Sequence, residues 1–146
     1  MTSATRPPDT TALLEELGQL LRQLTRLTGG ADDGPAMTAT QRIALVELGY
    51  EGPLRLNDLA QRIGTSTATA SRAVDALDSL GLIRRAPDAE DRRALSLTVS
   101  ELGRALLDER LARAATAFEP ATASLSPEER RELLELLGRM TDALRS

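Results

Sequence analysis

Cysteine and histidine are both absent from the 146 residues of this chain. Without cysteine there are no disulfides, thiolate nucleophiles or cysteine-ligated metal clusters. Without histidine there is no imidazole base and no imidazole-ligated metal. The sequence also shows no glycine-rich phosphate loop and no pair of carboxylates with partner bases. We therefore expect no metal, no cofactor and no enzymatic activity.

Aromatic residues and lysine are scarce as well. Tyr50 and Phe118 are the only aromatic residues, too few to build the stacking platform of a single-strand nucleic-acid binder. All 18 basic residues are arginine, whose guanidinium binds phosphate or a guanine edge in a bidentate geometry. No run of about 18 apolar residues could span a membrane, and residues 1–10 lack the apolar stretch of a signal peptide. We therefore expect a cytoplasmic protein without a membrane partner.

Capping residues predict where several helices begin. The sequence predicts three capping boxes, at Thr38 with Gln41, at Thr98 with Glu101 and at Ser126 with Glu129. The helix that begins after Thr38 is expected to bury its apolar residues, Ile43, Leu45, Val46 and Leu48. Asn57 is expected to cap a short helix, and Pro120 to end, or nearly end, the helix that begins after Thr98.

The central third of the chain predicts two helices joined by a tight turn. Gly64 ends the short helix, and Ser66 offers a capping oxygen to a longer helix that runs to about Leu80. Two strand-like segments follow, residues 82–85 and 94–97, joined by a polar turn. A helix-turn-helix followed by a hairpin is the winged-helix arrangement, in which the second helix enters the major groove of DNA.

The second helix has a composition that suits DNA recognition. At about 100° per residue its apolar side packs inward, and the opposite side is small, hydroxylated and ends in arginine. The candidate DNA-binding residues on this recognition helix are Ser66, Thr67, Ala68, Thr69, Ser71 and Arg72. The alternatives are that the hydroxyl residues only cap the helix and that Arg72 forms a surface ion pair with Asp75 or Asp78.

Four arginines surround the acidic turn of the hairpin. The candidate wing residues are Arg84, Arg85, Asp91, Arg92 and Arg93, and we expect Asp91 to hold and aim Arg93. The alternative is a solvated turn whose charges pair with one another. Residues 55–93 have a net charge of +1, whereas the whole chain has −4, so the acidic excess lies outside the candidate DNA face.

Leucine stripes at helical spacing lie near both ends of the chain. The stripe residues are Leu13, Leu17, Leu20, Leu24, Leu133, Leu137, Met140 and Leu144. These apolar faces are wider than a small monomer can cover, so we expect them to form a homodimer interface. The alternative is an intramolecular bundle of the flanking helices.

The ordered series of motifs resembles the MarR family of bacterial transcriptional regulators. The resemblance rests on Leu56–Gly64, Ser71-Arg72, Gly81–Arg85, Asp91–Arg93 and Leu97-Thr98. It implies a homodimeric winged-helix protein that binds a pseudo-palindromic operator, most often as a repressor, and that a small-molecule effector releases. It also implies that Asp91 and Arg93 correspond to the aspartate and arginine at the family's wing tip.

The predicted fold is mainly α with a small β-hairpin, in the order α-α-α-α-β-β-α-α. The expected divisions are a disordered arm (1–10), an N-terminal dimerisation helix and loop (11–35), a winged helix-turn-helix domain (36–98) and C-terminal dimerisation helices (99–146). The expected function is sequence-specific regulation of transcription through double-stranded DNA. The alternative is a winged-helix module, architectural or protein-recruiting, that needs no effector.

Overall fold

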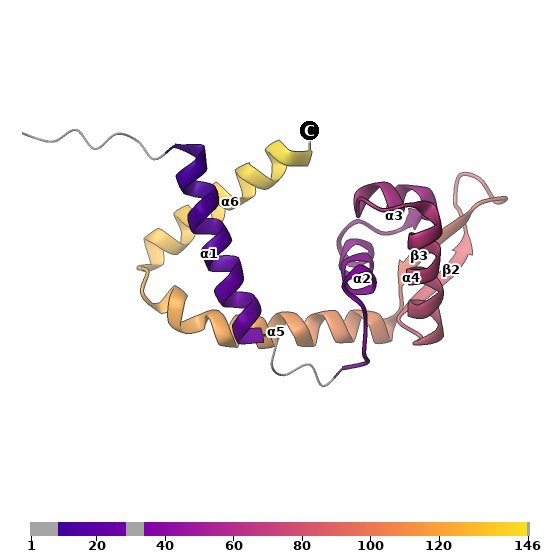
Figure 1. The fold of residues 1–146 in the computed structure, drawn as a ribbon, viewed down its shortest axis with the longest axis horizontal. Coiled ribbons are helices and arrows are strands. Elements are labelled where there is room, and N and C mark those ends of the chain that lie inside the picture. The colour runs from indigo at the N-terminus through magenta and orange to yellow at the C-terminus, as the bar shows by residue number, and fades with distance from the viewer. Residues whose placement is uncertain (1–8, 29–33, 146) are drawn as a thin grey trace, which may run out of the picture. The chain divides into compact units, whose positions relative to one another are not determined.

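The computed structural model describes residues 9–28 and 34–145. The chain divides into two compact units, one made of Met1–Ala31 with Arg113–Ser146 and the other of Asp32–Ala112. The second unit is called the winged unit below. It contains α2 (Ala39–Glu51), β1 (Leu54–Arg55), α3 (Leu56–Arg62), α4 (Thr67–Ser79), β2 (Ile83–Pro87), β3 (Leu95–Val99) and the start of α5 (Glu101–Ala123) (Figure 1).

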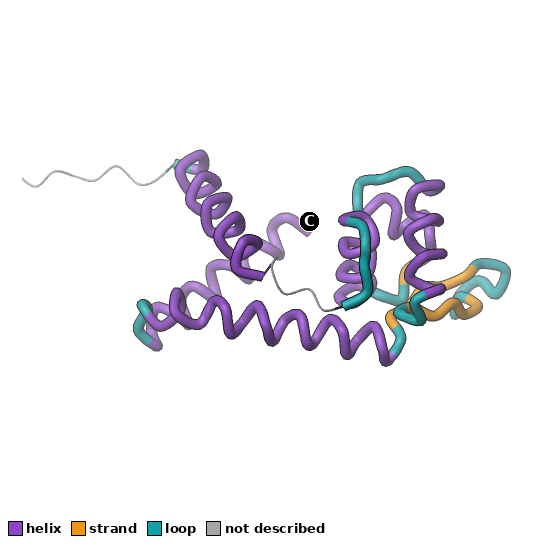
Figure 2. The backbone as a smooth tube through the Cα atoms, turned by 60° about the horizontal axis from the view of Figure 1, so that its bottom comes forward, coloured by secondary structure: helices purple, strands orange, loops and turns teal. Residues whose placement is uncertain are grey.

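The winged unit contains a small antiparallel sheet with strand order β1-β3-β2 (Figure 2). The hairpin of β2 and β3 pairs Ile83 with Val99 and Pro87 with Leu95. On the other side of β3, Leu54 of β1 pairs with Leu97. The expected helix-turn-helix and hairpin are therefore confirmed, and β1 adds a third strand that the sequence did not predict.

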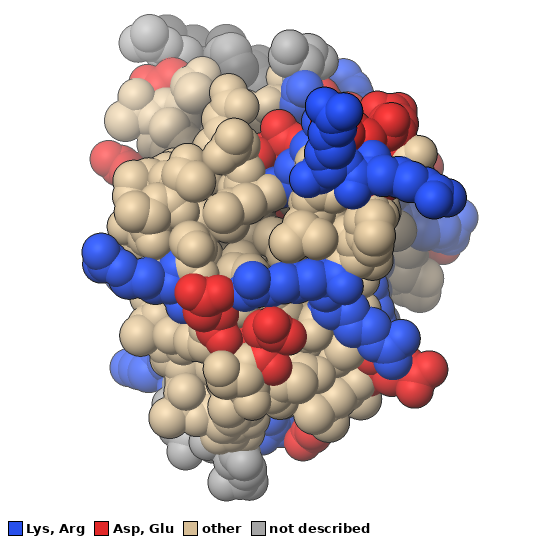
Figure 3. Space-filling view, turned by 90° about the vertical axis from the view of Figure 1, so that its right-hand side faces the viewer, with Lys and Arg blue, Asp and Glu red and all other residues tan. Residues whose placement is uncertain are grey.

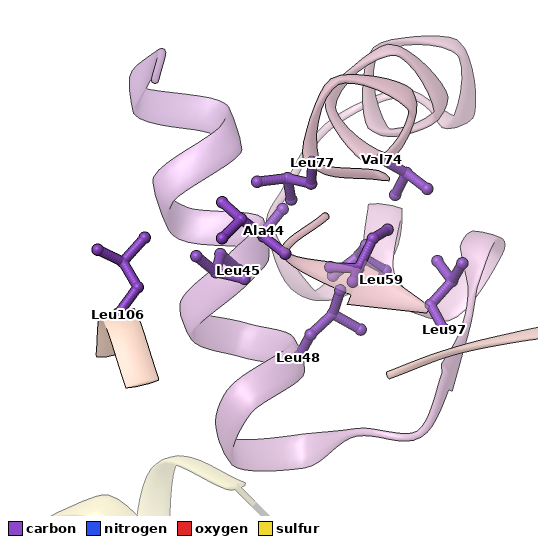
Figure 4. Close-up of a cluster of buried hydrophobic side chains, with 10 residues drawn as sticks. Ala44, Leu45, Leu48, Leu59, Val74, Leu77, Leu97 and Leu106 are labelled. Atoms are coloured by element: carbon purple, nitrogen blue, oxygen red, sulfur yellow. The ribbon is translucent and has the colours of Figure 1, made fainter. Parts of the chain in front are cut away.

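The core of the winged unit packs α2, α3 and α4 against the sheet. Figure 4 shows this cluster of buried side chains. Its residues are Ala44, Leu45, Leu48, Leu59, Val74, Leu77, Leu82, Ile83, Leu97 and Leu106. Burial of each large aliphatic side chain contributes about 1.5–3 kcal/mol relative to exposure, so this cluster fixes α4 and the hairpin on one scaffold.

Expectations that rest on local capping are partly confirmed. The capping boxes of Thr38 with Gln41 and of Ser126 with Glu129 are both present. Before α5, however, the Ser100 hydroxyl accepts from the Gly103 N–H, so Ser100 and not Thr98 caps that helix. Thr98 lies in β3, where the strand continues past the point at which its end was expected.

Three further expectations are wrong in detail. Asn57 is not an N-cap, because α3 begins one residue earlier with Arg55 at the cap. Pro120 does not itself end α5, which continues for three residues to Ala123 and tolerates the lost hydrogen bond and the crowding of the preceding turn. Ile43 and Val46 are exposed, because α2 buries the neighbouring face that contains Ala44, Leu45 and Leu48.

The other unit consists of α1 (Thr10–Thr28), the end of α5 and α6 (Pro127–Arg145). Thr10, expected in the disordered arm, begins α1, and residues 1–8 of that arm lie outside the described residues. Most of the leucine-stripe residues are exposed, and α6 buries none of its residues. Leu17 and Leu24 are half-buried.

Between residues 9 and 28 and from 34 to 145, no helix combines the length and apolar character needed to cross a membrane.

Candidate nucleic-acid interface

The N-terminal turn of α4 is held by its own hydroxyl groups. Ser66 accepts from the Thr69 N–H at 3.1 Å and donates to the Thr69 hydroxyl at 2.9 Å. Gly64 precedes this turn with a φ of +68°, a conformation that glycine adopts without strain. The tight turn between α3 and α4 therefore follows from the sequence 64–66, as expected.

The sides of α4 are divided as the helical spacing predicts. Ala70, Ala73, Val74 and Leu77 are buried against the core. On the opposite side Thr67, Ala68 and Arg72 are exposed, and Thr69 and Ser71 are half-buried at the flanks. The structure therefore leaves the predicted recognition residues at the surface of the winged unit.

Asn57 touches the recognition helix, a contact that sequence reasoning missed. The Thr67 hydroxyl donates to the Asn57 side-chain oxygen at 3.3 Å. This contact leaves the amide nitrogen of Asn57 beside the start of α4, at the exposed surface. Only the tight turn between the two helices could have indicated that these residues meet.

The two aspartates of α4 bind Arg85 of the wing. The Arg85 Nη2 donates to Asp75 Oδ1, and its Nε lies 3.3 Å from Asp78 Oδ2. Arg72 forms no ion pair with any residue that the structure describes, so the surface pair with Asp75 or Asp78 considered for it is not present. Arg85 therefore ties the wing to α4, while Arg72 remains exposed.

The turn of the wing is closed by hydrogen bonds around two aspartates. The Asp88 N–H donates to the Ala94 carbonyl, and the Ala94 N–H donates to the Asp91 carbonyl, both at 2.9 Å. The Asp91 carboxylate accepts from the backbone N–H of Arg93 at 3.0 Å. Asp91 thus fixes the backbone before Arg93 and does not hold its guanidinium, which corrects the expected contact.

Asp88 is the most constrained acidic group of the wing. Its Oδ1 accepts from the Glu90 and Asp91 N–H groups, each at 3.0 Å, and from the Arg55 Nη2 at 2.7 Å. The hydrogen bond from Arg55, followed by the two backbone donors, holds the pKa of Asp88 well below its usual range. The hydrogen bond with Asp88 also raises the pKa of Arg55.

An open pocket of about 480 Å³ lies between α4, the start of α3 and the wing. It is lined by three arginines, two small polar residues and an apolar floor, namely Arg55, Arg85, Arg93, Asn57, Ser71, Leu56, Val74, Ala94, Leu95 and Leu97. Ser71, Arg85 and Arg93 of the predicted site therefore meet here, whereas Arg84 and Arg92 do not line it. Figure 3 shows basic side chains extending from this end of the winged unit among acidic and uncharged ones.

Comparisons with a family model, with individual proteins and with solved structures all match this chain to transcriptional regulators. Residues 37–94 match the MarR family. The HTH-type transcriptional repressor NicR of Pseudomonas putida is 30% identical over 97% of this chain and 94% of its own length. The crystal structure of RV1404 from Mycobacterium tuberculosis is 27% identical, with a TM-score of 0.75 over 96% of this chain and 97% of that one.

A probable transcriptional regulator from Pseudomonas aeruginosa is 37% identical, with a TM-score of 0.54 over 88% of this chain and 98% of that one. Sequence and structure thus agree with the resemblance drawn from the motifs. The chain belongs to the MarR family of winged helix-turn-helix transcriptional regulators, a family of DNA-binding proteins that are not enzymes.

Proposed function

We propose that the protein is a cytoplasmic transcriptional repressor that binds a pseudo-palindromic operator as a homodimer and is released by a small-molecule effector. The observation that best supports DNA binding is the surface of the winged unit on which the exposed side of α4 borders the arginines of the wing. Ser71 of α4 and Arg93 of the wing line the same open pocket. This surface brings a groove-reading helix and phosphate-binding side chains together.

The exposed side of α4 is proposed to lie in the major groove. Ala68 lets the helix backbone approach the base edges, and Arg72 can bind a guanine edge through two hydrogen bonds. Neither residue is buried, and no described carboxylate neutralises Arg72. The proposed contact set also includes the hydroxyl residues of the same turn and its flank, Ser66, Thr67, Thr69 and Ser71.

The wing is proposed to contact the DNA backbone or the minor groove. Arg84, Arg92 and Arg93 are exposed and form no ion pair within the described part of the chain. Arg85 is proposed to contribute at the edge of the interface while Asp75 and Asp78 hold it, and Asp91 to shape the turn. The three unpaired arginines favour phosphate binding because they need not exchange an internal carboxylate for a phosphate.

The homodimer is supported by the apolar surface that the single chain leaves uncovered. Leu133, Leu137 and Met140 follow one side of α6 and are each between 41% and 48% exposed. A patch of this kind on a small protein marks an interface, and a two-fold dimer would present two recognition helices to two half-sites. The repressor role and the effector are extended from the resemblance and from the name of the similar protein NicR.

The test is selection of randomised duplex DNA by the purified protein, with sequencing of the bound pool at several salt concentrations. We expect enrichment of an inverted repeat whose half-sites are separated by about 34–36 Å, one helical turn. We also expect the affinity for that repeat to fall steeply with salt, because the wing and α4 neutralise phosphates. No enrichment even at low salt would contradict the proposal and favour a winged helix that recruits proteins.

A further inference from the structure

The seven-residue turn of the wing, residues 88–94, is held by the carboxylates of Asp88 and Asp91. Asp88 Oδ1 accepts the Glu90 and Asp91 N–H groups and thereby closes the first half of the turn. The second half is closed by the Asp91 carboxylate and by the backbone bond between Ala94 and Asp91. Because the Asp91 N–H is itself bound to Asp88, the positions of Arg92 and Arg93 depend on where Asp88 is held.

Arg55 holds that oxygen from the opposite edge of the sheet. β3 lies between β1 and β2, and Arg55 of β1 is in register with Ser96 of β3, which is in register with Ala86 of β2. Asp88 follows β2, so the Arg55 side chain crosses the central strand to reach it at 2.7 Å. This ion pair links β1, which is continuous with α3, to the turn of the wing.

The ion pair separates Arg55 from the unpaired arginines of the wing. The Asp88 side chain is only 16% exposed, and its acceptor oxygen already has three donors. The Arg55 side chain is 40% exposed, but Asp88 compensates its charge, whereas Arg92 and Arg93 have no ion-pair partner among the described residues. A charge-assisted hydrogen bond of this length also restricts the geometry of both side chains.

We propose that Arg55 and Asp88 are positioning residues for DNA binding, which fix the wing turn so that Arg92 and Arg93 meet the DNA backbone. Arg55 acts through the wing and does not itself bind phosphate. This inference rests on the proposed DNA-binding function, and it assigns a role to two residues that sequence reasoning did not place in the site.

The proposal and simple electrostatics predict opposite changes in DNA affinity for Asp88→Asn. If charge alone mattered, removing a negative group near DNA and releasing Arg55 would tighten binding. If the pair positions the wing, the neutral amide holds Arg55 weakly, the turn loosens and affinity falls. We expect Asp88→Asn to weaken binding of the selected operator about tenfold and to lower the salt slope by about 0.9 for each phosphate that the wing no longer neutralises.

Glu90→Gln is the matched control for this measurement. It removes one negative charge from the same turn, and the Glu90 side chain forms no hydrogen bond or ion pair with a residue that the structure describes. We expect this variant to bind the operator as tightly as the natural protein or more tightly. Tighter binding by Asp88→Asn, equal to that of Glu90→Gln, would overturn the proposal.

A second experiment separates positioning from direct contact. Arg55→Met, which keeps the length of the side chain but removes its charge, is measured alone and in an Arg92→Ala/Arg93→Ala background at a salt concentration where that background still binds. We expect Arg55→Met to lower the operator affinity about tenfold alone and less than about twofold in the double-alanine background. The effects are not additive because Arg55 acts through the same wing arginines that the background removes. Equal losses in both would show that Arg55 binds DNA itself or supports the whole fold.

Amide hydrogen exchange provides the structural readout. Asp88→Asn and Arg55→Met are expected to speed exchange at Glu90 and Asp91 without changing exchange in α2 or α4. Unchanged exchange in the turn would contradict the proposed route. If the proposed DNA-binding function itself were wrong, the natural protein would select no DNA sequence from the randomised pool, which distinguishes that outcome from failure of the positioning role.

Discussion

The arginines near the proposed DNA-binding surface differ in their partners, and the expected role of each changes with its partner. Arg55 is bound by the nearly buried Asp88, and Arg85 is shared by two aspartates of α4. Arg72 has no such partner among the described residues and projects from the recognition helix. Because a paired guanidinium must give up a carboxylate before it binds phosphate or a base, the local partner decides which arginines are available to DNA.

Arg72 and Arg93 are expected to respond differently to truncation. Arg72→Ala should weaken operator binding by about 1–3 kcal/mol and relax the base preference at one position, since it removes a base contact. Arg93→Ala should weaken binding to operator and unrelated DNA alike and lower the salt slope by about 0.9, since it removes a phosphate contact. Competition binding with single-base operator variants measures both effects.

The control for these variants is Arg131→Ala on α6, where the arginine pairs with Glu128 in the other unit. It changes the net charge by the same amount outside the proposed interface, so operator affinity should stay within about twofold. Equal losses on specific and unrelated DNA for Arg72→Ala would remove the base-reading role from that residue.

At the scale of single elements, expectations succeeded where the determining contacts are local. The boxes at Thr38 and Ser126 each need only a residue three positions away, and both are present. The cap of α5 was misplaced because Ser100 and Thr98 are both good caps, and pairing of Thr98 with Arg84 in the sheet selects Ser100. Tertiary pairing therefore decided a choice that local chemistry left open.

The contacts that the sequence could not reveal are those between distant segments. β1 has only two residues, too short to show an alternating pattern. The Arg55–Asp88 pair joins residues 33 positions apart, and nothing in either segment marks the other. The recognition face of α4 was predictable because its burial follows helical periodicity, whereas the partners of the wing arginines required the folded structure.

Close packing of α5 on the sheet gives a prediction for Gly103. A Cβ at Gly103 would collide with the Leu82 carbonyl oxygen and with a Val99 methyl. The carbonyl belongs to the backbone and also accepts from the Ser100 N–H, so it cannot rotate away. Gly103→Ala should therefore lower the free energy of unfolding by about 1–3 kcal/mol, although alanine is the better helix former by up to about 1 kcal/mol.

Gly138→Ala is the matched control, because a Cβ there meets no atom within 4 Å in the protomer. Chemical denaturation should show this variant to be as stable as the natural protein or more stable by up to about 1 kcal/mol. A Gly103→Ala variant with unchanged stability would show that α5 can move away from Leu82 without cost.

At the scale of the whole molecule, the acidic excess and the two leucine stripes lie outside the proposed DNA-binding surface. The chain has a net charge of −4, yet residues 55–93 have +1, so the proposed DNA-binding region does not share the acidic excess of the chain. The exposed leucines of the two stripes lie instead on α1 and α6, in the other unit. The proposed DNA contacts and the proposed contacts with a second copy of the chain thus belong to different units.

Dimerisation and operator affinity are therefore expected to fail together in Leu137→Asp. A carboxylate on the leucine stripe of α6 would be buried unpaired in the proposed interface, and the resulting monomer would contact one half-site only. Without the second half-site, operator binding should weaken on the order of 100-fold or more. Analytical ultracentrifugation and binding to operators with one or two half-sites measure the two effects.

Arg139→Asp places the same carboxylate on α6 at about 200° from Leu137 around the helix axis. Because this position lies away from the stripe, the variant should remain dimeric and bind the complete operator normally. If Leu137→Asp also stayed dimeric with normal affinity, α6 would not form the interface and its exposed leucines would need another partner. If it became monomeric but kept full affinity, recognition would not depend on two half-sites, and the two-fold operator would have to be abandoned.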